Sequence, residues 1–539
     1  MKKPLRLLVT LVLGICMLSG TFGCGGVNPY EGKTIINFGC YDGGWGREWL
    51  DVAIEKFEQM YPEYHVAVDY NKSYTGSTLY GKIDVIPQDI YYGSISSLYD
   101  YLDNDKLMDV TDVMNTPLNE YLSDSQIPVT ETKTIASKMW TDMKDYVTSY
   151  DGKYYSVPFG GGFYSLNYDR DLFNSKRLFI AKDGTPCNLS GDLSVGQDGV
   201  EGTYDDGLPV TYQEFTDLLY RMNKNNVIPF TWSSIGGYTQ HFVHAMSVAQ
   251  DGLDVFNTFK FMEGTYTFAG DSEPTTITKA NAYLLRNTRG KRDALQFARD
   301  VIDDGYYDPQ AGAASMDFLT AQDTYLMSIE NSKHGSGKPI AFFIDGGHWY
   351  NEAKNTLAEM ADMSDDYKDR KFGVMPFPWF DDATATRSTY FLSSAASSIF
   401  IRKNAVEAKG CKKLLAFLNS DEALRISSAT CGVIRYMNFE LTEADLQKMP
   451  YYYRTMHEAA RSSDICYNLC NNPLIFKNYD YFDEMGWEWS CTTANGTVLN
   501  NPLNNFKNSE TRDVMVDDYF AALRTGGQRD WANIYSEGN

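Results

Sequence analysis

The stretch that most constrains the fold is a strand–helix–strand pattern in residues 34–70. Residues 34–38 form a short apolar run with β-branched side chains, which predicts a buried strand. Apolar side chains then recur every three or four positions over residues 49–60, as on a helix that packs against a sheet, and Pro62 ends that helix. Residues 65–70 alternate like a second strand. A unit of this length normally gives two parallel strands with a right-handed crossover, so we predict an α/β fold.

A glycine-rich turn joins the first of these strands to the helix, and it carries Tyr41, Asp42 and Trp45. Ligands of open α/β sheets bind beyond the carboxyl ends of the strands, where this turn would lie. A tryptophan beside three glycines is poor material for a core and good material for a cleft. We therefore predict Tyr41, Asp42 and Trp45 as ligand-binding residues.

Length and composition limit the class of protein. At 539 residues the chain is too long for one ordinary core, so we expect two or more lobes. Its formal net charge of −23 argues against nucleic acid and anionic lipid head groups as partners, because both need a basic surface. The 39 tyrosines and 9 tryptophans suit a protein that handles hydroxyl-rich ligands, although most of these rings will belong to the core.

Residues 1–23 have the pattern of a secretory signal peptide, with three basic residues near the start and an apolar run over residues 5–18. That run is too short for a comfortable membrane span. The segment resembles a bacterial lipoprotein signal, which implies a lipid on Cys24, although Thr21 and Phe22 depart from the usual residues. We expect a protein anchored by this lipid to the outer face of the bacterial cell membrane. The alternatives are an uncleaved anchor and a plain secreted protein.

The cysteine pattern leaves the pairing open. If Cys16 is removed with the signal and Cys24 carries lipid, seven cysteines remain, and an odd number cannot all pair within one chain. Cys466 and Cys470 lie four positions apart and near Cys491, so a disulfide in this region is one interpretation.

Two groups of residues raise the question of a metal. Asp198, Asp205 and Asp206 lie in a glycine-rich loop whose carbonyl groups could help to wrap a calcium ion. The loop lacks the EF-hand spacing, and a solvated loop without metal is an equal alternative. His241 and His244 lie three positions apart without a third ligand nearby, which favours a core or surface role. We therefore expect no required cofactor, with structural calcium as a side hypothesis.

Four later segments end predicted strands with glycine, polar or aromatic residues, as the first turn does. The clearest is residues 340–349, a strand followed by Asp345, two glycines, His348 and Trp349. For each predicted residue, ordinary packing is the alternative. The further predicted ligand-binding residues are Tyr92, Ser94, Phe163, Tyr164, Trp232, His348 and Trp349.

An ordered set of motifs carries a family resemblance. In chain order the motifs are CGG at residues 24–26, the unit at 34–70, YSVPFGGGFYSLNYDRDLF, TYQEFTDLL, KPIAFFIDGGHWYNEA, KFGVMPFPW and NAVEAKGCKKLLAFLNSDEAL. With these motifs the chain resembles the extracellular solute-binding lipoproteins of ABC importers, of the maltose-binding type (bacterial solute-binding protein family 1). The resemblance implies a type II periplasmic-binding-protein-like fold, in which two lobes, each a sheet flanked by helices, enclose a cleft.

The resemblance also implies where the chain passes between the lobes, namely near residues 157–162, 372–378 and 432–437. The expected division follows from it: signal peptide 1–23, anchor and linker 24–33, lobe one 34–158 plus 377–430, and lobe two 160–375 plus 431–539, with 182–209 as a loop insertion. The insertion, the long C-terminal region and the surplus cysteines depart from the family pattern.

The function implied by the resemblance is capture without catalysis. Such a protein binds a carbohydrate, expected here to be an oligosaccharide, and delivers it to the membrane permease of an ABC importer. The first alternative is a secreted glycoside hydrolase, which needs two carboxylates about 5–5.5 or 6.5–9.5 Å apart, and no strand-end pair of glutamates stands out. The second alternative is a surface protein that tethers glycans. The sequence does not name the sugar and leaves room for another polar solute.

Overall fold

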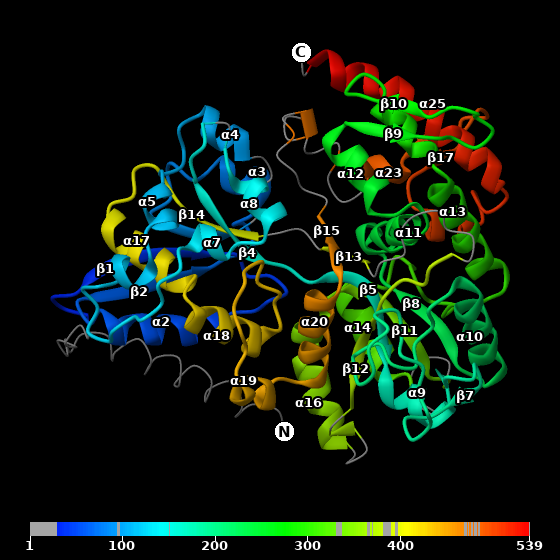
Figure 1. Cartoon of the computed structure of the whole chain (residues 1–539), viewed down its shortest axis with the longest axis horizontal. Helices are drawn as coiled ribbons and strands as arrows, with labels where there is room; N and C mark the ends of the chain where they lie inside the picture. Colours follow the sequence, from blue (N-terminus) through cyan, green and yellow to red (C-terminus); the bar gives the residue numbers. More distant parts are fainter. Residues whose placement is uncertain are drawn as a thin grey trace, which may run out of the picture.

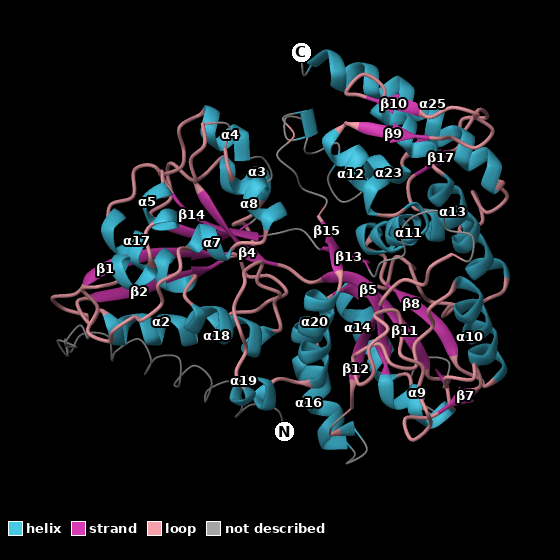
Figure 2. Ribbon diagram, in the orientation of Figure 1, coloured by secondary structure: helices cyan, strands magenta, loops and turns pink. Residues whose placement is uncertain are grey.

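The computed structural model forms two lobes, each built on one sheet with helices around it (Figure 1, Figure 2). This confirms the predicted two-lobed α/β architecture. The residues that the structure describes are 30–93, 98–149, 151–329, 337–363, 367–368, 370–380, 390–393, 397–467, 472, 474–475, 478, 482 and 486–537.

The smaller sheet contains the strand–helix–strand unit expected from the sequence. Strand β1 (Thr34–Cys40) pairs in parallel with β2 (Tyr64–Tyr70) and with β3 (Ile90–Gly93). Strand β14 (Ser397–Ile401) then pairs antiparallel with both β3 and β4 (Ser156–Gly160), which gives the order β2-β1-β3-β14-β4.

Helices cover both faces of the smaller sheet. The predicted apolar stripe of α2 (Glu48–Met60) is buried except for Val52, which is 37% exposed, and α2 lies beside α18 (Asp421–Cys431). Helix α17 (Ala408–Leu418) packs against β14 and buries most of its length. The shorter helices in this part of the chain are α3 (Gly76–Tyr80), α4 (Leu98–Asp103), α5 (Thr111–Asn115), α6 (Leu118–Tyr121), α7 (Ile135–Lys138) and α8 (Thr141–Val147).

The larger sheet is organised around β5 (Phe163–Asp169), which pairs antiparallel with three strands. These are β11 (Ile340–Gly346), β12 (Phe372–Met375) and β13 (Tyr390–Ser393). Strand β8 (Ile228–Trp232) is parallel to β11, and β15 (Asp464–Cys466) is parallel to β13.

The motif TYQEFTDLL spans the N-cap Thr211 and the first part of α10 (Tyr212–Lys224). It begins with a capping box in which Thr211 and Glu214 each accept a backbone hydrogen bond from the other. The other helices of this lobe are α9 (Arg170–Lys176), α11 (Gly236–Asp251), α12 (Leu253–Phe261), η1 (Ala282–Asn287), α13 (Arg289–Asp303), α14 (Phe318–Met327), α15 (Trp349–Glu352), α16 (Lys354–Met363), α20 (Tyr451–Ser462), α23 (Gly486–Trp489), α24 (Pro502–Lys507) and α25 (Val516–Glu537). Helix α19 (Glu443–Lys448) packs beside α18 of the smaller lobe. Three strand pairs complete the fold, β6 (Phe179–Ile180) with β7 (Pro186–Cys187), β9 (Gly264–Tyr266) with β10 (Thr275–Ile277), and β16 (Cys491–Thr492) with β17 (Val498–Leu499).

The passages between the two sheets differ in one place from the expectation. The first expected passage, at residues 157–162, lies between β4 and β5. The third, at residues 432–437, runs beside it, and Ile434 there forms a β-bridge with Gly161. The expected passage at residues 372–378 is wrong, because β12 and β13 both pair with β5, so the chain changes sheet between residues 393 and 397. Pro376 and Pro378 follow the last residue of β12, so they end this strand and do not mark a passage between the lobes. Strand β13 therefore belongs to the larger sheet, although residues 377–430 were expected in lobe one. The lobe boundaries themselves stay a prediction.

The cysteines of the described residues form no disulfide. All six are buried with free thiols, namely Cys40, Cys187, Cys411, Cys431, Cys466 and Cys491. A bridge between Cys466 and Cys491 is therefore wrong: Cys466 sits in β15 and Cys491 in β16, each packed into the core of the larger lobe. Cys470 lies outside the described residues.

We expect these buried thiols to resist alkylation in the native protein. Burial raises the pKa of Cys431 and Cys491 to about 12, which leaves about one thiolate in ten thousand at pH 8. Peptide mapping after iodoacetamide treatment should show both unmodified in native buffer and fully modified in urea. Protection that persists in urea and ends only after reduction would instead reveal a disulfide.

Candidate functional site

The turn after β1 reaches across to the other lobe. Trp45 is only 8% exposed, and its ring lies against Gly162, which precedes β5 of the larger lobe. A Cβ atom added at Gly162 would lie 3.1 Å from the Trp45 ring and 3.0 Å from the Cα of Gly347. The absence of a side chain at Gly162 is therefore what lets the indole approach so closely.

A second glycine-rich turn, after β11, meets the first one. The Trp45 and His348 rings are 5.9 Å apart and meet edge to face. The Asn351 side chain donates a 2.7 Å hydrogen bond to the carbonyl of Gly44, and Lys354 forms a 3.2 Å ion pair with Glu48. The structure thus brings together two turns that lie more than 300 residues apart in the sequence.

Five rings continue from this contact into the larger lobe, and we name them the interlobe aromatic group: Trp45, His348, Tyr238, Tyr164 and His241. Tyr238 shares a 3.1 Å hydrogen bond between its hydroxyl and Nε2 of His348. The ring centroid of Tyr164 lies 6.2 Å from that of Tyr238. Tyr164 also stacks on His241, with 3.7 Å between the two ring centroids. His348, Tyr238 and Tyr164 are half-buried, so each combines ring surface with a reachable polar edge.

Polar groups border the aromatic group on both sides. Asp42 is held by Arg47 through two hydrogen bonds of 2.6 and 3.1 Å, and this pairing lowers the pKa of Asp42. Burial raises the pKa of Tyr41, with a smaller effect from the charge of Glu352. Asp345 is fully buried behind the second turn, and burial raises the pKa of its carboxyl group well above the usual range. The pairing with Arg47 thus favours the ionised form of Asp42, whereas burial disfavours the ionised form of Asp345.

Four of the predicted ligand-binding residues lie in the core. Tyr92, Phe163, Trp232 and Trp349 are each at most 2% exposed. Trp349 is the first residue of α15, and its ring packs among Phe343, Tyr325, Phe372 and Tyr452 at 5.3–5.7 Å. The turn points His348 toward the other lobe and packs Trp349 back onto the sheet, so the ring that lies against Trp45 is His348 and not the predicted Trp349.

The remaining packed residues have equally specific partners. Trp232 donates its indole N–H to Asn504, Phe163 stacks on Phe391, and Tyr92 packs against Trp49. Ser94 lies outside the described residues. The structure adds Tyr238, His241 and Asn351, which the sequence prediction missed. Tyr238 follows β8 and a pair of glycines, the same signal as in the other two turns.

The comparison with known families decides the class of the protein. A model of the bacterial extracellular solute-binding proteins matches residues 53–437. The chain belongs to this family. No curated protein sequence matches it.

Solved structures share the fold of this solute-binding protein at low sequence identity. One from a study of xylan utilisation by Caldanaerobius polysaccharolyticus has a TM-score of 0.55 and 11% identity, covering 94% of this chain and all of that one. A chitin oligosaccharide binding protein has a TM-score of 0.52 and 13% identity, covering 93% and 99%. The solute receptor AcbH, described as preferring β-D-galactopyranose, has a TM-score of 0.51 and 12% identity, covering 94% and 99%.

The acidic loop of this solute-binding protein is closed by its own hydrogen bonds. Asp205 accepts backbone N–H groups from Gln197 and Asp198 and the hydroxyl of Thr203, and Asp206 accepts the N–H of Gly202. Over the described residues there is no group of three or more His, Cys, Asp or Glu side chains arranged to hold a metal ion. The structure therefore gives no support to calcium at Asp198, Asp205 and Asp206, whose carboxylates serve as acceptors for the loop.

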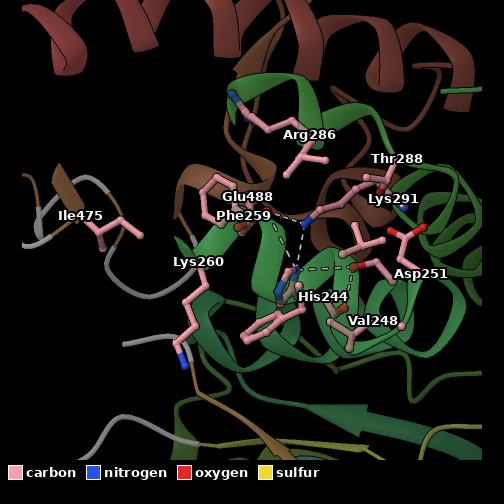
Figure 3. A pocket seen from close by; sticks show the side chains of 15 residues that line it. His244, Val248, Asp251, Phe259, Lys260, Arg286, Thr288, Lys291, Ile475 and Glu488 are labelled. Carbon is pink, nitrogen blue, oxygen red and sulfur yellow. Dashed lines mark hydrogen bonds and ion pairs between the residues drawn. The ribbon is translucent and has the colours of Figure 1, made fainter. Parts of the chain in front are cut away.

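His244 lines a pocket in the larger lobe together with Lys291 and Glu488 (Figure 3). Lys291 bridges the Glu488 carboxylate at 2.5 Å and Nδ1 of His244 at 2.8 Å, and all three side chains are buried. Burial lowers the pKa of His244 to about 3, so its ring is neutral and accepts a hydrogen bond from Lys291. His244 thus has the predicted core role, as a member of a buried ion-pair cluster.

The signal and anchor segment, with Cys24, lies outside the described residues. Within the described ranges, no helix combines the length and apolar character needed to cross a membrane.

Proposed function

We propose that this solute-binding protein captures a carbohydrate between its lobes and delivers it to the permease of an ABC importer. The observation that carries the proposal is the interlobe aromatic group, in which Trp45 of the smaller lobe meets His348 and, beyond it, three further rings of the larger lobe. The flat apolar faces of a sugar ring pack on aromatic rings, and such burial contributes about 25 cal/mol per Å².

The polar edges of the same group suit sugar hydroxyls. Asp42, Tyr238 and His348 offer acceptors and donors, and a hydrogen bond to an ionised carboxylate contributes roughly 1.5–3 kcal/mol. Opening the lobes would break the contacts of Asn351 with Gly44 and of Lys354 with Glu48, and closing them around a ligand would restore them. Structural relatives named for chitin oligosaccharides, xylan and galactopyranose support a saccharide ligand.

The proposal includes attachment by lipid at Cys24 to the outer face of the bacterial cell membrane, and an oligosaccharide rather than a single sugar as ligand. A glycoside hydrolase and a glycan-tethering protein are the two other classes. A glycoside hydrolase would form cleavage products, whereas a capture protein releases its ligand unchanged. A glycan-tethering protein would bind long chains, whereas a capture protein binds short oligosaccharides.

A thermal-shift screen with mono-, di- and oligosaccharides tests the proposal. A saccharide that binds the native state should raise the melting temperature in a concentration-dependent way, because binding stabilises by RT ln(1 + [L]/Kd). The ligand should be recovered unchanged by chromatography. Cleavage products would favour the hydrolase, and a response only to long polysaccharides would favour tethering.

A further inference from the structure

A glutamate outside the predicted ligand-binding residues lies at the contact between the two turns. Glu352 is the last residue of α15, and its backbone N–H donates a 3.2 Å hydrogen bond to the carbonyl of His348, one helical turn earlier. A Cβ atom added at Gly44 would lie 2.5 Å from the His348 ring and 2.9 Å from Oε1 of Glu352. Glu352 of the larger lobe therefore lies against the turn of the smaller lobe, beside the interlobe aromatic group.

One oxygen of the Glu352 carboxylate is left for a ligand. Gln322 donates a 2.7 Å hydrogen bond to Oε2. Oε1 accepts no hydrogen bond from the described residues, and it keeps accessible surface on a side chain that is half-buried. A carboxylate has lone pairs for several donors, so Oε1 can accept hydrogen bonds from a molecule that enters between the lobes.

The cations near this contact are already paired with other carboxylates. Arg47 lies 2.6 Å from Asp42, and Lys354 lies 3.2 Å from Glu48. Among the described residues, no lysine, arginine or histidine side chain forms an ion pair with Glu352, whose only printed side-chain bond is to a neutral amide. The charge of Glu352 is therefore unmatched, and the contact carries an excess of negative charge.

The charge of Glu352 acts on the phenol groups around it. Burial raises the pKa of Tyr41, and the charges of Glu352 and Asp42 raise it further. Burial also raises the pKa of Tyr238, with smaller effects from Asp345 and Glu352. Both phenols therefore stay protonated and can donate hydrogen bonds, whereas an ionised Glu352 can only accept them.

We infer that Glu352 binds the ligand directly and restricts it to saccharides without acid groups. This inference rests on the proposed capture of a saccharide between the lobes. A sugar hydroxyl donates a charge-assisted hydrogen bond to Oε1, which is stronger than a bond between neutral groups. A uronate or sulfated sugar places a second negative charge beside Glu352 where water is partly excluded, and the two charges repel, since Arg47 and Lys354 are already paired.

Calorimetric titration of the purified protein with matched saccharides tests the inference. The probes are di- and trisaccharides of neutral hexoses, each paired with the uronic-acid saccharide of the same linkage. We expect a neutral saccharide to bind saturably and its uronate partner to bind at least tenfold more weakly. The difference should widen at low ionic strength, because salt then screens the repulsion less.

Glu352→Gln separates the role of the charge from that of shape. The amide oxygen still accepts the bond from Gln322, so the variant should fold, and a thermal melt checks this. It should bind the neutral saccharide about tenfold more weakly and should discriminate less against the uronate. Glu359→Gln, an exposed position on α16 of the same lobe, makes the same change of charge and should bind both probes as the wild type does.

The outcomes distinguish this inference from the function on which it rests. Equal affinity of the wild type for the neutral and acidic members of a pair would overturn the inference and leave saccharide capture standing. Unchanged affinity and unchanged discrimination in folded Glu352→Gln would do the same. Binding of no saccharide of either kind would overturn the proposed capture itself, and the inference with it.

Discussion

Glu488→Leu is expected to lower the free energy of unfolding by about 3–5 kcal/mol, the cost of leaving one partner of a buried ion pair uncompensated. Lys291 is 4% exposed and Glu488 is 7% exposed, and their charged atoms are 2.5 Å apart. With Glu488 gone, the Lys291 ammonium keeps, among the described residues, its hydrogen bond to neutral His244, the ring of Trp489 at 4.3 Å and the more distant charge of Asp251. Urea unfolding of the variant measures the loss.

Two controls separate charge burial from general disturbance. The double variant Lys291→Met/Glu488→Leu removes both charges and should recover most of the lost stability, since apolar replacement of a whole buried pair is often neutral. Asp303→Asn breaks the 2.7 Å pair of Asp303 with Arg299 on an open helix face and should cost less than about 1 kcal/mol. Equal effects of Glu488→Leu and Asp303→Asn would contradict the account.

Trp45→Ala and His348→Ala are each expected to weaken saccharide binding by about 1.5–3 kcal/mol, a factor of roughly 10 to 100. Both rings stand at the contact between the lobes, and either deletion removes stacking surface or a hydrogen-bonding edge from the interlobe aromatic group. Trp45 is 8% exposed and packs at the edge of a core cluster, so a thermal melt of each variant checks that the fold survives. Calorimetry with the saccharide found by thermal shift measures the loss.

Trp349 serves as the control position, because its substitution should change the stability of the fold and not the affinity for the saccharide. Its ring is fully buried among aromatic residues, so Trp349→Ala should cost about 3–5 kcal/mol of stability through the cavity it leaves. Trp349→Phe should keep both the fold and the affinity. A loss of affinity in Trp349→Phe that matched the loss in His348→Ala would mean that the turn presents Trp349 to the ligand.

The sequence predicted those parts of the fold that depend on local periodicity. The apolar spacing over residues 49–60 predicted α2 and its buried face, apart from Val52, which belongs to that pattern and is 37% exposed. The passage near residues 372–378 was mispredicted because strand pairing is decided by distant partners. Nothing within KFGVMPFPW reveals that Phe372–Met375 will lie beside β5.

The location of the candidate site could be predicted from the sequence better than the residues that form it. Strand, glycine and aromatic patterns correctly located two turns that meet, but a glycine turn gives no local signal of which neighbouring side chain faces outward. His348 and Trp349 were therefore indistinguishable, and only the packing around Phe343 and Tyr452 assigns Trp349 to the core. Asn351 carried no signal, since its role arises from the carbonyl of Gly44 in the other lobe.

The most direct test of saccharide capture is a calorimetric titration of wild type and the Trp45→Ala/His348→Ala double variant with one oligosaccharide, followed by chromatography of the recovered ligand. The account predicts saturable binding by the wild type, recovery of the intact oligosaccharide, and little or no measurable binding by a double variant that unfolds at the wild-type temperature. Unchanged affinity in the folded double variant, or recovery of cleaved sugar, would contradict it.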